Sequence, residues 1–120
     1  MSNVVIKNTK KFGRGLYAVR DFKKGEIIEV SQVIVLDEVN TRICDATILG
    51  LYLFQWGKKE NHTALALGHG SLFNHSFKAN VKYEGNSKEM VFTAARNIQK
   101  GKQLFIDYGY DPTMYKGYYR

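Results

Sequence analysis

Residues 67–76 of this chain read LGHGSLFNHS, and an asparagine follows at position 80. Small and polar residues stand beside apolar ones in this segment. Such a mixture is typical of a place where backbone and amide groups contact the edge of a ligand. The segment therefore predicts a loop that recognises a ligand, and its neighbours along the chain must indicate which ligand that is.

Two histidines in this segment raise the alternative of a metal site. Only His62 adds a third imidazole to His69 and His75, Cys44 is remote in the sequence, and no acid has the helical spacing of a metal ligand. Ser76 beside His75 raises a second alternative, a nucleophile with its base, but adjacent side chains in a turn rarely face each other. The sequence thus predicts neither a zinc site nor a serine nucleophile.

Two further segments carry chemistry. Residues 12–17, FGRGLY, form a glycine-flanked turn that lets backbone N–H groups approach a ligand. This turn lacks the third glycine and the helix of a dinucleotide fingerprint, and on its own it also fits a plain hairpin. Residues 101–111, GKQLFIDYGYD, read as a strand that ends in two tyrosines around a glycine. They predict either an aromatic wall for an amine or an ordinary strand end.

The chain has 120 residues, 44% of them hydrophobic, which fits one domain with a modest core. The longest aliphatic run, residues 33–36, is too short to span a bilayer, and the N-terminus lacks the layout of a signal peptide. The single Cys44 cannot form an internal disulfide, so we expect an intracellular protein without membrane contact. The net charge of +7 allows a nucleic-acid partner, although dispersed basic residues favour an ordinary soluble surface.

Short segments rich in β-branched and aromatic residues predict a mostly β fold. They cover residues 4–6, 16–19, 27–36, 52–56, 81–83, 91–94 and 104–106. Only residues 41–49 predict a helix, with Thr41 as its N-cap.

One segment also recurs along the chain. Residues 18–25 return as residues 94–101, with alanine, arginine, lysine and glycine in matching places. Each copy reads as a strand, a tight turn with a positive-φ glycine, and a strand. The repeat indicates either a duplicated unit with approximate two-fold symmetry or one turn solution used twice.

In this order and with this separation, the three chemical segments resemble the SET-domain protein-lysine methyltransferases. Residues 13–17 resemble the opening glycine motif of that family, and residues 73–76 with Asn80 resemble its Asn-His-Ser signature. Residues 101–110 resemble its closing motif. The resemblance implies a SET domain, or β-clip, of short curved sheets with a C-terminal pseudo-knot, in which the closing segment passes beneath the Asn-His-Ser loop.

The chain also departs from the family pattern. Phe77 stands where many relatives carry a cysteine of a zinc cluster. The chain therefore resembles the minimal, zinc-free type found in viruses and bacteria. Lys102 and Gln103 replace two common glutamates, a change that we expect to matter little because it falls on a turn.

The resemblance implies S-adenosylmethionine as the cofactor. It assigns cofactor binding to the backbone around Arg14, Gly15 and Leu16. It further implies that Asn74 bonds the amino-acid portion of the cofactor and that the backbone of His75 bonds the adenine. The ring of His75 is then expected to be structural rather than catalytic.

By the same resemblance, Tyr108 is the expected catalytic residue, where a narrow channel carries the substrate lysine toward the methyl group. In-line displacement depends on alignment and electrostatics. The lysine, with an ordinary pKa of about 10.4, must lose its proton, and an aromatic channel beside a sulfonium favours that loss. Tyr52 and Tyr110 are further candidates for the channel wall, with a place in the core as the alternative.

Residues 1–111 are thus expected to form the SET domain. The short aromatic tail, residues 112–120, is expected either to cover the channel as a lid or to be a frayed terminus.

The expected function is methyl transfer from S-adenosylmethionine to a lysine of a histone tail or another basic protein. The alternatives are a catalytically silent SET-like module that binds peptide or nucleic acid, and a structural β-clip domain. The resemblance also allows a homodimer. The expected location is the cytoplasm, or a host nucleus if the protein is viral or a secreted effector.

Overall fold

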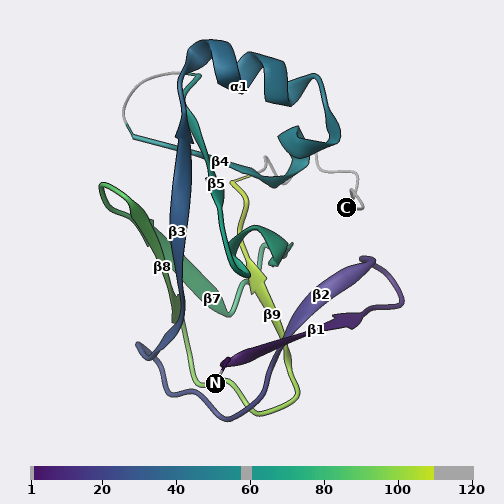
Figure 1. Cartoon of the computed structure of the whole chain (residues 1–120). Coiled ribbons are helices and arrows are strands. Elements are labelled where there is room, and N and C mark those ends of the chain that lie inside the picture. The colour runs from purple at the N-terminus through teal and green to yellow at the C-terminus, as the bar shows by residue number, and fades with distance from the viewer. Residues whose placement is uncertain (1, 58–60, 110–120) are drawn as a thin grey trace.

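The computed structural model describes residues 2–57 and 61–109, which form two sheets with little helix (Figure 1). The first sheet has the order β1-β2-β9-β6, with β1 Val4–Asn8, β2 Arg14–Ala18, β9 Gln103–Ile106 and β6 Asn74–His75. The second has the order β4-β5-β3-β8-β7, with β4 Leu53–Gln55, β5 Thr63–Ala66, β3 Ile27–Leu36, β8 Glu89–Ala94 and β7 Val81–Gly85. The helical elements are α1 Glu38–Asp45 and the 3₁₀ turns η1 Ile48–Tyr52 and η2 Gly70–Leu72. The expectation of a mostly β fold of short sheets is confirmed.

The core lies between the two sheets. In β8, the side chains of Met90, Phe92 and Ala94 are buried, while those that alternate with them are only partly covered. This alternation is that of a strand with one face on a core. Phe92 stacks on Phe73, the residue before β6, with ring centroids 4.6 Å apart. The second sheet therefore supports the loop that leads into the first.

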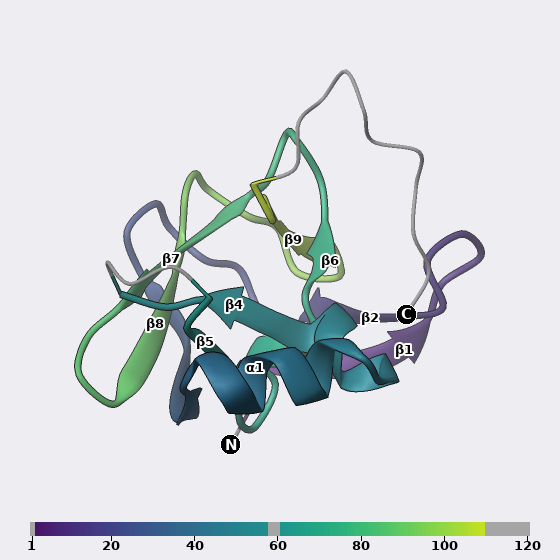
Figure 2. The same ribbon diagram turned by 90° about the horizontal axis from the view of Figure 1, so that it is seen from above.

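The helix α1 begins earlier than the sequence predicts. The side chain of Asp37 is its N-cap, and Oδ1 accepts a hydrogen bond from the backbone of Asn40 at 2.8 Å. Thr41 is not the cap, because its buried hydroxyl bonds instead with that of Thr63 on β5 at 2.9 Å. Figure 2 shows α1 lying along one side of the molecule. No described helix is long and apolar enough to cross a membrane.

The two copies of the repeated segment form a pair of turns joined by reciprocal hydrogen bonds. Gly25 N–H donates to the carbonyl of Ala94 at 2.8 Å, and Gly101 N–H donates to the carbonyl of Ala18 at 2.9 Å. The two glycines have φ angles of +90° and +88°, as the repeat predicts. Because each bond has a counterpart with the copies exchanged, the two segments are related by an approximate two-fold axis.

Side chains extend the same symmetry. The backbone N–H of Lys100 donates to the carboxylate of Asp21 at 2.7 Å. At the equivalent place in the other copy, the N–H of Lys24 donates to the side-chain oxygen of Asn97 at 2.9 Å. The turn pair, residues 18–25 with residues 94–101, thus links the two sheets, because one copy connects β2 to β3 and the other connects β8 to β9.

Candidate functional site

The candidate site forms where the last strand, β9, lies between β2 and β6 (Figures 1 and 2). β9 runs antiparallel to β2 and parallel to β6. The side chain of Asn80 holds β9 in place, because its Nδ2 donates to the carbonyl of Gln103 at 2.9 Å and its Oδ1 accepts from the N–H of Phe105 at 2.8 Å. The closing segment therefore meets the Asn-His-Ser loop, as the resemblance implies.

Asn74 is the buried polar centre of this junction. Its Nδ2 donates to the carbonyl of Arg14 at 2.7 Å and to Oε1 of Gln103 at 3.0 Å. Both amide protons are thus held by the protein. Its Oδ1 takes no hydrogen bond from any residue of the described ranges, so it remains as an acceptor. The ammonium group of a methionine moiety is a donor that fits it, and the residues present therefore suit S-adenosylmethionine.

Gly15 lies against this amide on β2. A Cβ at position 15 would lie 2.5 Å from Oε1 of Gln103, 2.9 Å from Cγ2 of Thr9 and 3.0 Å from Nδ2 of Asn74. Only glycine allows this approach without displacing its neighbours. Arg14 and Gly15 therefore meet Asn74, whereas Leu16 lies one residue further along, where β2 pairs with β9 and its side chain is fully buried.

His75 links the loop to the end of β9. Its Nδ1 accepts a hydrogen bond from the backbone N–H of Tyr108 at 2.9 Å, so Nδ1 carries no proton. Burial lowers the pKa of His75 below 6.5, and the carboxylate of Asp107 opposes this only in part. Although Oδ1 of Asp107 lies 3.8 Å from Nδ1, the ring is neutral and the two do not form a salt bridge. This arrangement supports a structural role for the ring.

Tyr108 is anchored at both ends. Its N–H binds His75, and its hydroxyl donates to the backbone carbonyl of Phe73. Its ring lies tilted against the His75 ring, with centroids 5.1 Å apart. The phenol is therefore fixed beside the strand that carries Asn74.

Tyr108 also lines a cavity of about 210 Å³. The other lining residues come from the η1–β4 segment and from β7, and they are Gly50, Leu51, Leu53, Phe54, Gln55 and Tyr83. The cavity is thus an aromatic and aliphatic space with the hydroxyl-bearing ring of Tyr108 at its border. Its chemistry suits an alkyl chain that ends in an amine.

The residues predicted to line the channel differ in where they lie relative to this cavity. Tyr52 lies between two lining residues in the chain, yet it is not among the described residues that line this cavity; its carbonyl accepts from Ser71 Oγ at 3.1 Å. Tyr110 and the expected lid, residues 112–120, lie outside the described residues, so their roles stay predictions.

Sequence reasoning missed two participants. Tyr83 lines the cavity, and its hydroxyl donates to the carbonyl of Asp107 at 3.4 Å. The available signal was its position two residues after the buried Val81, which puts both side chains on one face of β7. Gln103, expected to matter little, accepts from Asn74 and lies on β9 rather than on a turn.

No group of three or more histidine, cysteine, aspartate or glutamate side chains within residues 2–57 and 61–109 could hold a metal ion. The histidines that raise the metal alternative have other partners. His69 lies beside Glu29, with Nδ1 3.4 Å from the carboxylate, and His75 binds Tyr108.

Known proteins are similar to this chain in sequence and in fold. A family model described as SET domain matches residues 13–109. The chain is 32% identical over 111 residues to a Schizosaccharomyces pombe histone-lysine N-methyltransferase specific for H3 lysine-37, across 90% of this chain and 74% of that protein. It is also 32% identical over 106 residues to human histone-lysine N-methyltransferase 2B, across 80% of this chain and 4% of that protein.

Solved structures agree. A Plasmodium falciparum protein described as a candidate histone methyltransferase superposes with a TM-score of 0.69 at 28% identity, across 94% of this chain and 98% of that chain. The Chaetomium thermophilum Polycomb Repressive Complex 2 bound to S-adenosylmethionine superposes with a TM-score of 0.75 at 20% identity, across 90% of this chain and 15% of that chain, which shows the shared fold. The chain belongs to the SET-domain family of protein-lysine methyltransferases, which use S-adenosylmethionine as the methyl donor.

Proposed function

We propose that this SET-domain methyltransferase acts on a lysine of a histone tail, with Tyr108 as its catalytic residue. Asn74, His75 and the backbone of Arg14, Gly15 and Leu16 form the cofactor side of the site. The observation that carries the proposal is the double position of Tyr108. Its hydroxyl binds the backbone next to Asn74, and its ring borders the cavity of about 210 Å³.

Asn74 supports the assignment of the cofactor side. Because both protons of its amide are engaged by Arg14 and Gln103, its Oδ1 is oriented as a fixed acceptor. An acceptor that is held in place on a largely buried side chain binds a cationic donor with little loss of side-chain entropy. The backbone at Arg14 and Gly15 lies beside it, where the missing side chain of Gly15 leaves close access.

The cavity beside Tyr108 supports the assignment of the substrate side. Leu51, Leu53 and Phe54 supply apolar walls, and Tyr83 and Tyr108 supply rings with polar tips. An alkylammonium entering this space is desolvated, which favours the neutral amine.

The chemistry is a single displacement. When bound, S-adenosylmethionine supplies a methyl group on a positively charged sulfur. The lysine amine would give its proton to solvent and would then accept this methyl group in place of that proton. Tyr108 fixes the direction of approach, because its backbone N–H is held by His75 and its hydroxyl by the carbonyl of Phe73. Alignment of this kind supplies much of the rate of a bimolecular transfer.

The similar proteins support a histone as the substrate. The Schizosaccharomyces pombe protein named as a histone H3 methyltransferase aligns over 90% of this chain. A histone substrate requires the protein to reach chromatin, so we place its action in a nucleus. A homodimer stays a prediction, and light scattering of the purified protein decides it.

The first experiment measures S-adenosylmethionine binding by calorimetry for wild type, Asn74→Ala and the control Asn40→Ala. Asn40 is exposed in α1, far from β9 in the fold. We expect micromolar binding by wild type and Asn40→Ala, and weakened binding by Asn74→Ala. Methylation of histone H3 and H4 tails then tests the activity, with Tyr108→Phe as the control of strongly reduced activity. Absence of cofactor binding by wild type would favour the silent module.

A nucleic-acid contact has one supporting observation. The turn pair brings Lys23 and Lys24 of one copy to the same end of the molecule as Lys100 of the other, and all three are exposed. We propose that this end contacts the phosphate backbone of nucleosomal DNA during histone methylation. Binding to duplex DNA that weakens steeply with salt, and that weakens further in a triple lysine-to-alanine variant, is the expected result.

A further inference from the structure

The second sheet has two edges that face each other. β4 and β7 are the outermost strands of the order β4-β5-β3-β8-β7, yet their side chains meet. The rings of Phe54 on β4 and Tyr83 on β7 lie with centroids 5.3 Å apart at an interplanar angle of 64°. The sheet is therefore curled so that side chains, rather than backbone hydrogen bonds, join its two edges.

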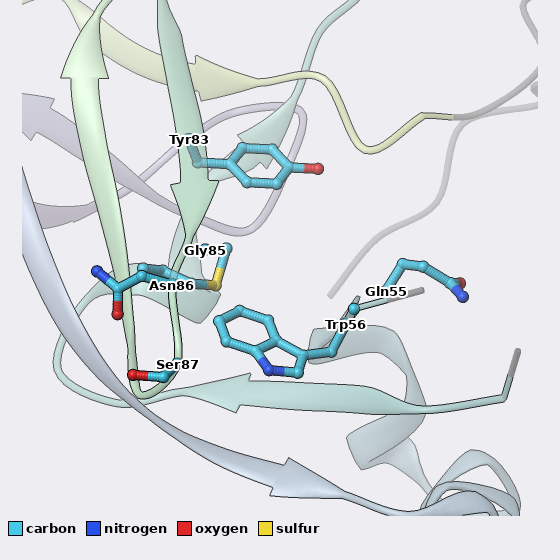
Figure 3. Close-up of a pocket in the computed structure, with 8 residues that line it drawn as sticks. Gln55, Trp56, Tyr83, Gly85, Asn86 and Ser87 are labelled. Atoms are coloured by element: carbon cyan, nitrogen blue, oxygen red, sulfur yellow. The ribbon is translucent and has the colours of Figure 1, made fainter. Parts of the chain in front are cut away.

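Gly85 marks the next contact along this seam. A Cβ at position 85 would lie 2.7 Å from Cζ3 and Cη2 of Trp56. The φ angle of Gly85 is not positive, so its backbone conformation does not demand glycine. Glycine is present because the indole of Trp56 needs the space. Figure 3 shows the indole lying beside Gly85, below the ring of Tyr83.

A cavity of about 410 Å³ opens at this point, which we name the Trp56 pocket. Its apolar walls come from Trp56, Tyr83 and Met90, and its rim includes Gln55, Asn86 and Ser87. The pocket is open to solvent at one side, so a side chain of another molecule can enter it. An indole and a phenol ring offer a large apolar contact area at little cost in conformational entropy.

No charged side chain lines the Trp56 pocket within the described part of the chain. Glu84 and Glu89 are neighbours in sequence, but alternation along β7 and β8 directs them away from the face that carries Tyr83 and Met90. Glu89 instead binds Gln32 at 2.8 Å. A charged substrate residue would lose hydration here without gaining an oppositely charged partner among the described residues, so the pocket favours an uncharged, apolar one.

The Trp56 pocket adjoins the cavity assigned to the substrate lysine. Tyr83 and Gln55 line both. One ring, that of Tyr83, therefore separates the space beside Tyr108 from the space beside Trp56. An extended peptide rises about 3.3 Å per residue, so a side chain about two or three residues from the methylated lysine reaches the pocket.

We propose that the Trp56 pocket binds an apolar side chain, aliphatic or proline, of the protein substrate about two or three residues from the target lysine. It thereby sets the sequence preference of the enzyme. This inference rests on the proposed function, since it takes the cavity beside Tyr108 as the place of the lysine.

The test has two independent readouts. Trp56 is the only tryptophan of the chain, so intrinsic fluorescence reports on the pocket directly. Lysine peptides that carry leucine, proline, glycine, aspartate or arginine at each flanking position are titrated into wild type with S-adenosylhomocysteine present. We expect a blue shift of emission for leucine or proline at one position and none for aspartate. The same peptides are then compared by kcat/KM for methylation.

For the preferred position we expect kcat/KM about tenfold higher with leucine than with aspartate, the usual value of one apolar pocket. Trp56→Ala should remove this preference. The kcat/KM for the peptide with glycine at this position and the affinity for S-adenosylmethionine should stay unchanged. Gly85→Ala, which forces the indole to move, should reduce the preference and serves if Trp56→Ala does not fold. Glu84→Ala, on the same strand but the opposite face, is the control and should keep the preference.

Failure of the inference differs from failure of the proposed function. Methylation with a preference that is equal in wild type and Trp56→Ala, and with no change in fluorescence, would overturn the pocket and leave the function standing. A preference for arginine at the position would overturn the apolar class. A blue shift that follows leucine or proline without any methylation would contradict the proposed function while supporting the pocket.

Discussion

The backbone N–H of Tyr108 donates a hydrogen bond to Nδ1 of His75 across 2.9 Å. This bond between the segment that carries the proposed catalytic residue and β6 exists only while Nδ1 is unprotonated, whereas the backbone pairing of β9 with β6 does not depend on it. Because burial lowers the pKa of His75, the ring stays neutral near neutral pH. This single contact couples the protonation of a buried imidazole to the geometry of methyl transfer.

This coupling predicts a loss of stability in acid. The folded pKa of His75 lies below its ordinary value of 6.5, so the unfolded chain binds more protons than the folded one as the pH falls through that range. The free energy of unfolding should therefore decrease as the pH drops below that value. Urea unfolding at about pH 7.5 and about pH 5.5 measures this. His75→Gln should show a shallower dependence on pH than His62→Gln, and equal slopes would contradict the assignment.

Tyr108→Phe removes the hydroxyl bonded to the carbonyl of Phe73. We expect kcat to fall about 100-fold, because small misalignment is costly in a transfer that depends on approach. The dissociation constant of S-adenosylmethionine should change little. Tyr52→Phe is the matched comparison, and since Tyr52 is not among the described residues that line the cavity, we expect a change of less than about threefold in kcat. Equal losses in the two variants would restore Tyr52 to the channel wall.

Gln103 should affect the affinity for S-adenosylmethionine through its hydrogen bond with Asn74. Gln103→Met removes the acceptor at 3.0 Å from Nδ2 of Asn74, and we expect S-adenosylmethionine affinity to fall severalfold. Gln103→Glu keeps an acceptor in the same place and should keep the affinity. In a double-mutant cycle with Asn74→Ala, the losses should be less than additive, because the two residues act as a unit. Additive losses measured by calorimetry would show that Gln103 acts elsewhere.

Gly15→Ala should weaken cofactor binding rather than merely destabilise the fold. The added Cβ would lie 2.5 Å from Gln103 and 3.0 Å from Asn74, so the amide must move. We expect a loss of about tenfold or more in affinity, as for other misplaced binding groups. Gly25→Ala is the control, because it strains the turn between β2 and β3, where an added Cβ meets no atom within 4 Å, and it should leave affinity unchanged.

The turn pair should respond symmetrically. Gly25→Ala and Gly101→Ala each place a Cβ at a φ near +90°, and we expect each to lower the free energy of unfolding by about 1–2 kcal/mol. Gly25→Asn should cost less, because asparagine tolerates positive φ better. Urea unfolding checks all three variants. A large loss for one glycine and none for the other would contradict the two-fold relationship of the turns.

Features set by local chemistry could be predicted from the sequence. The positive-φ glycines of the turn pair follow from the repeat, and the meeting of Asn74 with Gly15 follows from motifs whose resemblance to a family is specific. Thr41 was misjudged as an N-cap because two capping residues lie one turn apart, and the partner that buries the Thr41 hydroxyl comes from a different strand.

Features set by the curl of the second sheet could not be predicted. Tyr83 lies on β7 and Trp56 directly follows β4, at opposite edges of the sheet, so their place beside the site depends on how far the sheet bends. Alternation along a strand specifies a face but carries no information about that bend. Gln103 was undervalued for a related reason, since its partner lies 29 residues away and becomes visible only through the register of β9.

The position of β9 in the first sheet also constrains when the site can form during translation. Its partners in the first sheet are β2, near the start of the chain, and β6, so the cofactor side cannot assemble before residues 103–106 have left the ribosome. Pairings so distant in sequence form slowly, because the entropy of closing a long loop must be overcome first. A nascent chain that stops before β9 has the Asn-His-Ser loop and its contact with Phe92, but it lacks the strand that pairs with β6. The chain therefore has to be translated through β9 before the cofactor side of the site can form.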